Sequence, residues 1–370
     1  MFSFNNPVEI KFGDGIFTRL NEFVEDFGYE RIVVAASGSQ VKNGVVELIE
    51  SLLGDKVRGV ITGIEANPTL ANVESIASAM YEHDAHAVIA TGGGSVMDAA
   101  KAAAASYMQG IDVGELFGHT DFSEALPIIA VPSTSGSASE VTPTSVISDK
   151  ENGLKVPLAG KGLYPKLAVV DPELTFTCPP NITAVSGIDV ICHALDSFGS
   201  VKSNPISDTL AVRAAGLAFR NLEAAFLEPE NREARRNMSL GSMLAGLAFS
   251  QTGTTASHAM SYYLTSHFNI PHGEACAFSL DEWFVINAEA DPRLHHHAKD
   301  IGFEDAGDLA RRFNELKGKV GLRMTLKDLG IGQEAMEDIA DETLKQANMK
   351  NNIAQLDKSG IVQLLERKRG

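Results

Sequence analysis

Four side chains of types that bind metal ions lie in the second half of the chain. Asp189 and His193 are four residues apart, which places a carboxylate and an imidazole on one face of a helix. His258 and His272 come from two further segments, and His272 follows Pro271, a residue typical of helix starts. An Asp/His pair at this spacing is also common on ordinary amphipathic helices. Together, however, one carboxylate and three imidazoles suit Fe²⁺, Zn²⁺ or another first-row metal ion better than Ca²⁺ or Mg²⁺.

The composition limits the kinds of partner. The chain has 370 residues, more than a single hydrophobic core usually supports, so we expect two domains. Hydrophobic residues make up 44% of it and charged residues 21%, as in an ordinary globular protein. The formal net charge of -17 argues against nucleic acid or an anionic membrane as a partner, because both require a basic surface.

Targeting patterns and cysteine usage both favour an intracellular protein. No apolar run is long enough to cross a membrane, and the first residues lack a basic segment followed by an apolar one, so we expect a cytosolic location. Cys178, Cys192 and Cys276 are scattered without a CxxC motif, which favours reduced thiols over disulfides. Cys192 and Cys276 are near candidate ligands, but we interpret them as small apolar packing residues.

The first half of the chain alternates short apolar runs with helical patterns, the order typical of a parallel α/β layer. We expect strands at residues 8–12, 32–35, 60–63, 87–91 and 127–131. From about residue 180 onward the pattern is helical, with small residues that allow close packing of helices. We therefore predict an α/β domain over residues 1–180 and an all-helical, metal-binding domain over residues 181–370.

Gly92, Gly93, Gly94 and Ser95 join the strand that ends at Thr91 to a strong helix-forming segment. Glycines at such a junction let backbone N–H groups approach a pyrophosphate, and the helix start adds partial positive charge. The run is neither GxGxxG nor a P-loop, and a glycine turn can also be only a tight connection. We interpret it as a candidate phosphate site.

A second loop of small residues, 132–140, follows the strand at 127–131. Its hydroxyl groups, among them those of Thr134 and Ser137, suit contact with a ribose or a nicotinamide amide, because open α/β sheets bind ligands at the carboxyl ends of their strands. The alternative is a solvated serine-rich turn.

Taken together, these stretches resemble the iron-dependent, or group III, alcohol dehydrogenase family over nearly the whole chain. The motifs that carry the resemblance are GIEANPT (63–69), GGGSVMDAAK (92–101), PSTSGSASEVT (132–142), AVVDPELT (168–175), PPNITAVSGIDVICHALDS (179–197), HAM (258–260) and IPHGEA (270–275). The resemblance implies a dehydroquinate synthase-like fold, with a Rossmann-like N-terminal domain and a helical C-terminal domain. It also implies hydride transfer between NAD or NADP and a small alcohol or aldehyde, in a homodimer.

The resemblance extends to individual residues. The positions that match the family's metal ligands, usually for Fe²⁺ and otherwise for Zn²⁺ or another first-row ion, are Asp189, His193, His258 and His272. The positions that match its cofactor site are Asn67, Gly93, Gly94, Ser95, Asp98, Thr134 and Lys155.

Three positions depart from the family pattern. Relatives often carry a second histidine four residues after the third ligand, where this chain has Tyr262, so a proton-relay or substrate contact is expected at Tyr262 or at His267. Asp196 stands where glutamate is usual, which alters a contact behind the ligands. After the second strand, Ser37 and Ser39 occupy a region where many relatives have an aspartate. Without that carboxylate the 2′-phosphate of NADP is not repelled, so either dinucleotide is admitted.

Other functions compete with a simple alcohol dehydrogenase. The departures at Tyr262 and His267 leave room for a polar or anionic aldehyde such as phosphonoacetaldehyde. A lyase of the dehydroquinate synthase type shares the fold, but no lysine or arginine is adjacent to a candidate ligand in the sequence. A non-catalytic nucleotide-binding regulator would need no convergent metal ligands.

His295, His296 and His297 are consecutive and point in different directions on a helix, so we assign them to an exposed face without a role.

Overall fold

The computed structural model describes residues 2–150, 152 and 154–370, and its residues form two compact units. The first, the α/β unit, is Asn6–Cys178. The second, the helical unit, is Pro179–Gly370 together with the N-terminal segment up to Asn5. The Asn5 backbone explains this assignment, since its N–H donates to Gln251 Oε1 (3.1 Å) and its carbonyl accepts from Gln251 Nε2 (2.9 Å).

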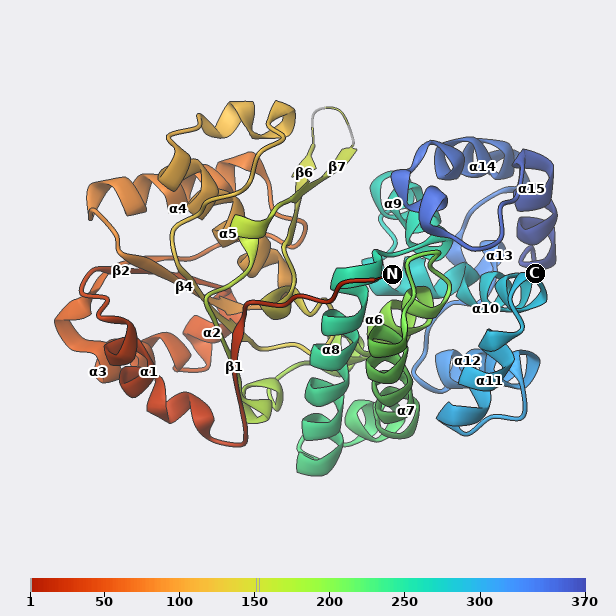
Figure 1. Cartoon of the computed structure of the whole chain (residues 1–370), viewed down its shortest axis with the longest axis horizontal. Coiled ribbons are helices and arrows are strands. Elements are labelled where there is room, and N and C mark those ends of the chain that lie inside the picture. Colours follow the sequence, from red (N-terminus) through yellow and green to blue (C-terminus); the bar gives the residue numbers. More distant parts are fainter. Residues whose placement is uncertain (1, 151, 153) are drawn as a thin grey trace. The chain divides into compact units, whose positions relative to one another are not determined.

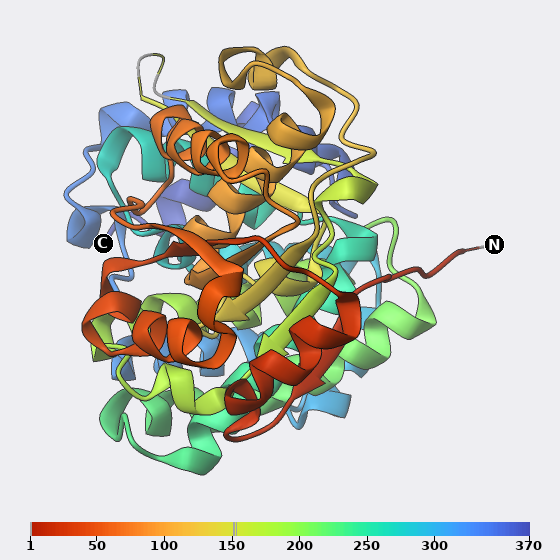
Figure 2. The ribbon, with the colours of Figure 1, turned by 90° about the vertical axis from the view of Figure 1, so that its left-hand side faces the viewer.

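A six-stranded parallel sheet forms the centre of the α/β unit, in the order β1-β8-β5-β4-β2-β3. The strands are β1 (Glu9–Phe12), β2 (Ile32–Ala36), β3 (Val57–Ile61), β4 (Ala87–Gly92), β5 (Ile128–Pro132) and β8 (Leu167–Val170). The helices are α1 (Leu20–Phe27), α2 (Gly38–Lys42), α3 (Val45–Leu53), α4 (Leu70–Glu82) and α5 (Gly94–Gln109). Helices α4 and α5 pack on one face of the sheet and α1 and α3 on the other (Figures 1 and 2).

The alternation of side chains along each strand explains why both faces are covered. In β2, Val33 and Ala35 pack towards α4 and α5, whereas Ile32 and Val34 pack towards α1 and α3. All of them are fully buried, which is why the strand reads as a continuous apolar run. The predicted parallel α/β layer is therefore confirmed.

Four of the five predicted strands are confirmed to within one residue, but three features differ. One is β8, which was not predicted as a strand. The third strand is Val57–Ile61 rather than 60–63, because Gly63 has a φ of 78°, which ends extended backbone. An antiparallel hairpin of β6 (Thr144–Asp149) and β7 (Leu154–Ala159) was not predicted. Pro157 within β7 conceals the strand pattern, since proline is rare inside sheets.

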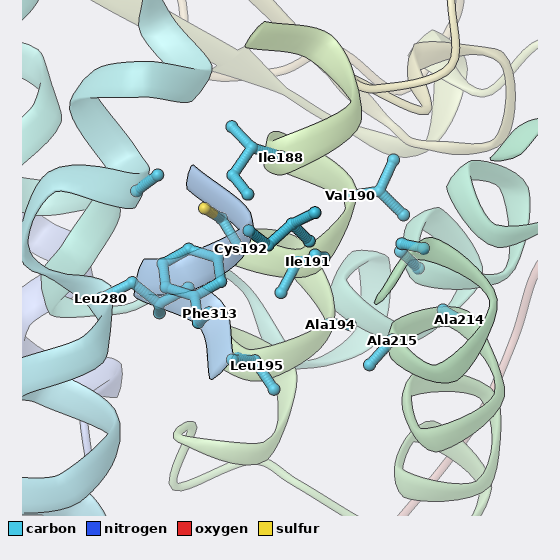
Figure 3. Packing of buried hydrophobic residues seen from close by; sticks show 14 of the residues in the cluster. Ile188, Val190, Ile191, Cys192, Ala194, Leu195, Ala214, Ala215, Leu280 and Phe313 are labelled. Atoms are coloured by element: carbon cyan, nitrogen blue, oxygen red, sulfur yellow. The ribbon is translucent and has the colours of Figure 1, made fainter. Parts of the chain in front are cut away.

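The helical unit is built around α6 (Pro180–Phe198), which packs against α7 (Pro205–Leu227), α8 (Arg232–Thr252) and α10 (His272–Ala290). Its other helices are α9 (Ala256–Phe268), α11 (Arg293–Ile301), α12 (Ala306–Lys319), α13 (Leu326–Leu329), α14 (Met336–Lys345) and α15 (Lys358–Arg367). Figure 3 shows Ile191 and Leu195 of α6 in this core. The predicted fold class, an α/β layer followed by a helical half, is confirmed. Among the residues that the structure describes, no helix has the length and apolarity to span a membrane.

Candidate metal and cofactor sites

Helix α6 presents three acidic or imidazole side chains on one face. Asp189, His193 and Asp196 are separated by four and three residues, so at about 100° per residue they point within about 60° of one another. All three are buried, with 5%, 5% and 2% of their surfaces exposed. The ring of His193 stacks on Phe249 of α8 (centroids 4.1 Å apart), which holds the imidazole in place. One helix therefore positions half of the predicted ligands.

Helices α9 and α10 bring the other two predicted ligands to this face. His258 lies in the first turn of α9, and α10 begins at His272 directly after Pro271, as predicted from the sequence. The next residue, Gly273, allows α10 to approach α6 closely. A Cβ atom there would lie 2.0 Å from the carbonyl oxygen of Val185. Only glycine fits this contact, and the close packing of α10 on α6 brings His272 near Asp189.

The donor atoms of these residues converge. One ligand atom each of Asp189, His258, His272 and Cys276 lie within 4.8 Å of one another. His193 lies beside this group without belonging to it, with Nε2 3.9 Å from Asp189 Oδ2 and its ring centroid 4.8 Å from that of His258. The structure thus brings three of the four predicted ligands into one group in the helical unit and places the fourth next to it. It adds the thiol of Cys276, which we had interpreted only as a packing residue.

The buried polar atoms at the centre of this group fit a metal ion. In the described part of the chain, Asp189 Oδ1 and His258 Nε2 are both buried and have no hydrogen-bond partner. They lie 3.7 Å apart. Two such donors bound tetrahedrally to one ion would be separated by about 3.4 Å. Because burying polar atoms without a partner is unfavourable, this pair is best explained by an ion that both would bind.

Asp196 fixes the imidazole of His258 through its other ring nitrogen, Nδ1. Its Oδ2 lies 2.7 Å from His258 Nδ1, and it also accepts from the Thr255 N–H (2.8 Å) and the Ser257 hydroxyl (2.8 Å). Burial alone would raise the pKa of Asp196, but the charge of His258 and these hydrogen bonds lower it. The carboxylate therefore stays ionised and directs Nε2 of His258 towards the other ligands.

We expect the Asp196→Asn variant to bind metal about tenfold to a hundredfold more weakly than the native chain, because the amide holds His258 less firmly. Competition of the full-length protein with a chromophoric chelator measures this loss. Asp291→Asn, at an exposed ion pair with Arg293 in the same unit, is the control and should leave the affinity unchanged. Equal affinities for Asp196→Asn and the native chain would rule out the orienting role.

The two candidate relay residues on α9 lie in different surroundings. Tyr262 is one turn after His258 on the same face, and its hydroxyl lies 3.5 Å from Nδ2 of Asn348. Burial raises the pKa of this hydroxyl. His267 is nine residues from His258, which places it on the opposite face and about 13 Å further along the helix. It is exposed and stacks on Tyr263 (centroids 3.9 Å apart). Of the two, only Tyr262 flanks the metal-binding group within this unit.

In the α/β unit, the predicted cofactor residues gather at a switch point of the sheet. The chain runs outward from β2 to β3 and then returns to place β4 on the other side of β2. Ser37 follows β2, and Gly92 to Gly94 end β4 and begin α5. The Ser37 N–H donates to Thr91 O (3.1 Å), which ties the two strand ends together. Open α/β sheets bind dinucleotides at such a crevice.

The glycine turn is packed tightly against hydroxyl side chains. An added Cβ would come 3.2 Å from Ser37 Oγ at Gly92, 3.4 Å from Thr134 Oγ1 at Gly93 and 2.5 Å from Ser137 Oγ at Gly94. The structure therefore needs glycine for space at Gly94, whereas the contact at Gly93 is an ordinary one, and it places Thr134 and Ser137 beside the start of α5. Ser95 lies in the first turn of that helix. Exposed backbone N–H groups and hydroxyls at a helix start are well suited to a pyrophosphate.

Asp98 has internal partners. Its two carboxylate oxygens accept from the Ser139 hydroxyl (2.7 Å) and the Val146 N–H (3.0 Å). The buried Lys101, one turn later, donates to Ser139 Oγ (2.8 Å) and to two backbone carbonyls. Asp98 thus fixes the loop that carries Thr134 and Ser137.

The hairpin of β6 and β7 connects the two remaining candidate cofactor residues, Asn67 and Lys155. Ser148 of β6 pairs with Lys155 of β7, and its N–H donates to the carbonyl of Pro68 (2.7 Å), next to Asn67. Asn67 is exposed, with a left-handed φ of 58°. The hairpin therefore joins Lys155 to the loop that carries Asn67.

Glu140, buried beside this network, makes the stability of the α/β unit depend on pH. Burial raises its pKa from 4.5 to about 7. The folded state then binds more protons than the unfolded state between these values, so the free energy of unfolding should fall as the pH rises from about 4.5 to about 7, by up to about 3 kcal/mol. Urea unfolding across this range should show the slope, and Glu140→Gln should remove it. A Gln variant with the native slope would contradict this prediction.

Comparisons with known proteins agree with this geometry. The sequence profile of the iron-containing alcohol dehydrogenases matches residues 7–172, and the profile of the C-terminal part of the Fe-containing alcohol dehydrogenase family matches residues 183–369. The chain belongs to the iron-containing alcohol dehydrogenase family. This family member is an oxidoreductase that transfers hydride between NAD or NADP and a small alcohol or aldehyde and uses a metal ion.

Individual relatives of this family member cover the whole chain. It is 31% identical to the NADPH-dependent butanol dehydrogenase of Clostridium saccharobutylicum, over 99% of this chain and 97% of the relative. Among solved structures, it resembles sulfoacetaldehyde reductase from Bifidobacterium kashiwanohense in complex with NAD+ (35% identity, TM-score 0.95, 100% and 98% of the two chains). It also resembles the alcohol dehydrogenase from Oenococcus oeni (30% identity, TM-score 0.93, 100% of both chains).

Proposed function

We propose that Asp189, His193, His258 and His272 bind the catalytic metal ion and that the turn at Gly92 to Gly94 binds the dinucleotide pyrophosphate. The observation that carries the metal assignment is the pair of buried atoms, Asp189 Oδ1 and His258 Nε2, which have no hydrogen-bond partner in the described part of the chain. When bound, a divalent ion supplies Lewis acidity towards the substrate oxygen, and a nicotinamide donates or accepts hydride.

Residues of the chain keep one proposed ligand ionised, orient another and position the loop beside the glycine turn. Asp189 is the anionic ligand, and burial would raise its pKa, but the three neighbouring imidazoles lower it, so it stays ionised. Asp196 fixes the orientation of His258. In the α/β unit, Asp98 holds the loop of Thr134 and Ser137 against the glycine turn through Ser139. We assign the cofactor contacts to Ser37, Asn67, Ser95, Thr134, Ser137 and Lys155 and the loop-positioning role to Asp98.

A substrate panel tests the proposed function. The metal-free full-length chain is reconstituted anaerobically with Fe²⁺ or Zn²⁺ and mixed with short alcohols and aldehydes and both reduced and oxidised dinucleotides. We expect a change in nicotinamide absorbance only when a metal ion is present. Activity that is equal in the presence of excess chelator would overturn the metal assignment.

Ser37 bears on the choice of dinucleotide. Its hydroxyl lies 2.9 Å from that of Ser39, so two hydroxyls and no carboxylate follow β2. Hydroxyls can donate hydrogen bonds to a 2′-phosphate, and a carboxylate would repel it. We therefore propose that NADP(H) is accepted as well as NAD(H).

A polar or anionic aldehyde is the second candidate substrate. Tyr262, Asn348 and Thr254 form a hydrogen-bonded group next to His258, in which Asn348 Nδ2 lies 3.5 Å from Tyr262 Oη and 2.6 Å from Thr254 Oγ1. Such donors suit a charged oxyanion better than an alkyl chain. The similarity to a sulfoacetaldehyde reductase points to the same class of substrate, and a phosphonate such as phosphonoacetaldehyde has comparable chemistry.

Tyr262→Phe distinguishes the two substrates. We expect it to lower kcat/KM for sulfoacetaldehyde or phosphonoacetaldehyde about tenfold to a hundredfold and to change that for butanal about threefold at most, because only the anion uses the hydroxyl. Steady-state kinetics with both substrates measure the ratio. Parallel losses for the two aldehydes would indicate a general proton relay at Tyr262 instead. His267→Ala in the same assay tests the other predicted relay position.

The remaining alternatives have less support. A dehydroquinate synthase-type lyase needs cationic side chains at the ligands, but Lys317 donates to the carbonyl of Ala277 and the Arg323 guanidinium is paired with Glu274. A non-catalytic regulator does not explain the converging donors. On the family resemblance we further propose a homodimer, and on the three free cysteines of the chain a cytosolic location.

A further inference from the structure

The thiol of Cys276 lies among the proposed metal ligands and has no part in the function described so far. Cys276 is one turn after His272 on α10, so the two side chains share a face of the helix. Its sulfur is 3.7 Å from His272 Nε2 and 3.8 Å from His272 Nδ1. Being almost equidistant from both ring nitrogens, the sulfur is not aligned with the lone pair of either, which makes this a poor hydrogen bond.

The sulfur lies at a distance that suits a shared ion. With bonds of about 2.3 Å to sulfur and about 2.1 Å to nitrogen, tetrahedral ligands are separated by about 3.6 Å. An imidazole binds an ion through one ring nitrogen, and the separation of 3.7 Å between the sulfur and His272 Nε2 is close to this value. The same group contains Asp189 Oδ1 and His258 Nε2, two atoms in residues more than nine-tenths buried that have no hydrogen-bond partner among the described residues. The unpartnered atoms point to a cation independently of the cysteine.

The other buried thiol of the helical unit differs in this respect. Cys192 is on α6 between Asp189 and His193 in the sequence, but it does not belong to the group of converging donors. Figure 3 shows it in the apolar core with Leu280 and Phe313. Burial alone therefore does not place a cysteine at the site, and Cys192 provides a matched control.

We propose that Cys276 is a further ligand of the metal ion, and that its sulfur raises the affinity of this site for zinc and cobalt relative to iron. The inference rests on the proposed metal site. On binding, a bond forms between Sγ and the ion, the S–H bond breaks and the proton passes to solvent, with no change in oxidation state. Thiolate is a soft ligand, and soft ligands favour Zn²⁺ over ions that prefer oxygen and nitrogen donors.

Cobalt spectroscopy tests this proposal without an activity measurement. The metal-free full-length chain is titrated with Co²⁺, whose thiolate complexes absorb in the near ultraviolet by charge transfer. We expect one bound ion per chain and a charge-transfer band in the native protein and in Cys192→Ala. Cys276→Ser and Cys276→Ala should still bind one cobalt ion but lose the band. Both should also bind Zn²⁺ at least about tenfold more weakly in chelator competition, with a smaller change for Fe²⁺.

The outcomes separate this proposal from the proposed function. The sulfur ligand would be overturned if the native protein bound one cobalt ion without a thiolate band, or if the band persisted in Cys276→Ser. The other four proposed ligands would still hold if His258→Ala lost the ion. A native chain that binds no cobalt or zinc would overturn both proposals.

Discussion

His258→Ala should lose metal binding and at least about 10³-fold in kcat/KM. The imidazole Nε2 is one of the two buried atoms without a hydrogen-bond partner, and its removal also leaves Asp196 without its main partner. Loss of the ion removes several kcal/mol of stabilisation from the transition state, and each 1.4 kcal/mol is a factor of about ten in rate. Metal analysis and steady-state kinetics on the same preparation measure both effects.

His296→Ala is the control for this substitution. His296 is exposed on α11 in the same unit, and it alone of the three consecutive histidines lies on an exposed face, as predicted for all of them. His297 instead stacks on Phe198 (centroids 4.6 Å apart). We expect native metal content and activity for His296→Ala. A His258→Ala protein that keeps both its metal ion and its turnover would contradict the ligand assignment.

Gly94→Ala should weaken dinucleotide binding by about 100-fold or more. The added Cβ would lie 2.5 Å from Ser137 Oγ and 2.8 Å from its Cβ, so the helix start or the loop must move. Two charge-assisted hydrogen bonds to phosphate contribute about 3 kcal/mol or more, and their loss corresponds to about 100-fold in Kd. Isothermal titration with NADH and NADPH measures the change.

Gly118→Ala is the matched control in the same unit. An added Cβ at Gly118 meets no described atom within 4 Å, so dinucleotide affinity should be unchanged. Because the proposed metal ligands lie in the helical unit, Gly94→Ala should also keep its metal ion. A Gly94→Ala protein with native dinucleotide affinity would show that the turn is only a tight connection.

The sequence was most informative where spacing and local backbone rules determine position. The spacing of four residues from Asp189 to His193 predicts a shared helix face, and Pro271 predicts the helix start at His272; both are observed. Glycines between a strand and a helix predict the turn at Gly93. These features depend on residues close in the chain, so no tertiary information is needed to interpret them.

Features that depend on packing could not be predicted from the sequence alone. Cys276 has the same spacing to His272 as His193 has to Asp189, so its pattern was visible, but only the converging donors distinguish it from the core residue Cys192. His267 was a candidate because Tyr262 occupies the place, four residues after His258, where relatives often carry a second histidine. The continuous helix from Ala256 to Phe268 places it on the opposite face. Asp98 matched a cofactor position, but its carboxylate oxygens have partners inside the unit.

The most direct test of the account is an anomalous-scattering map of crystals grown from protein purified without chelators. We predict one peak about 2 Å from donor atoms of Asp189, His193, His258 and His272. A map in which these side chains share no peak, or in which the bound ion lies on other residues, would contradict the central claim that one cation organises the helical unit for catalysis.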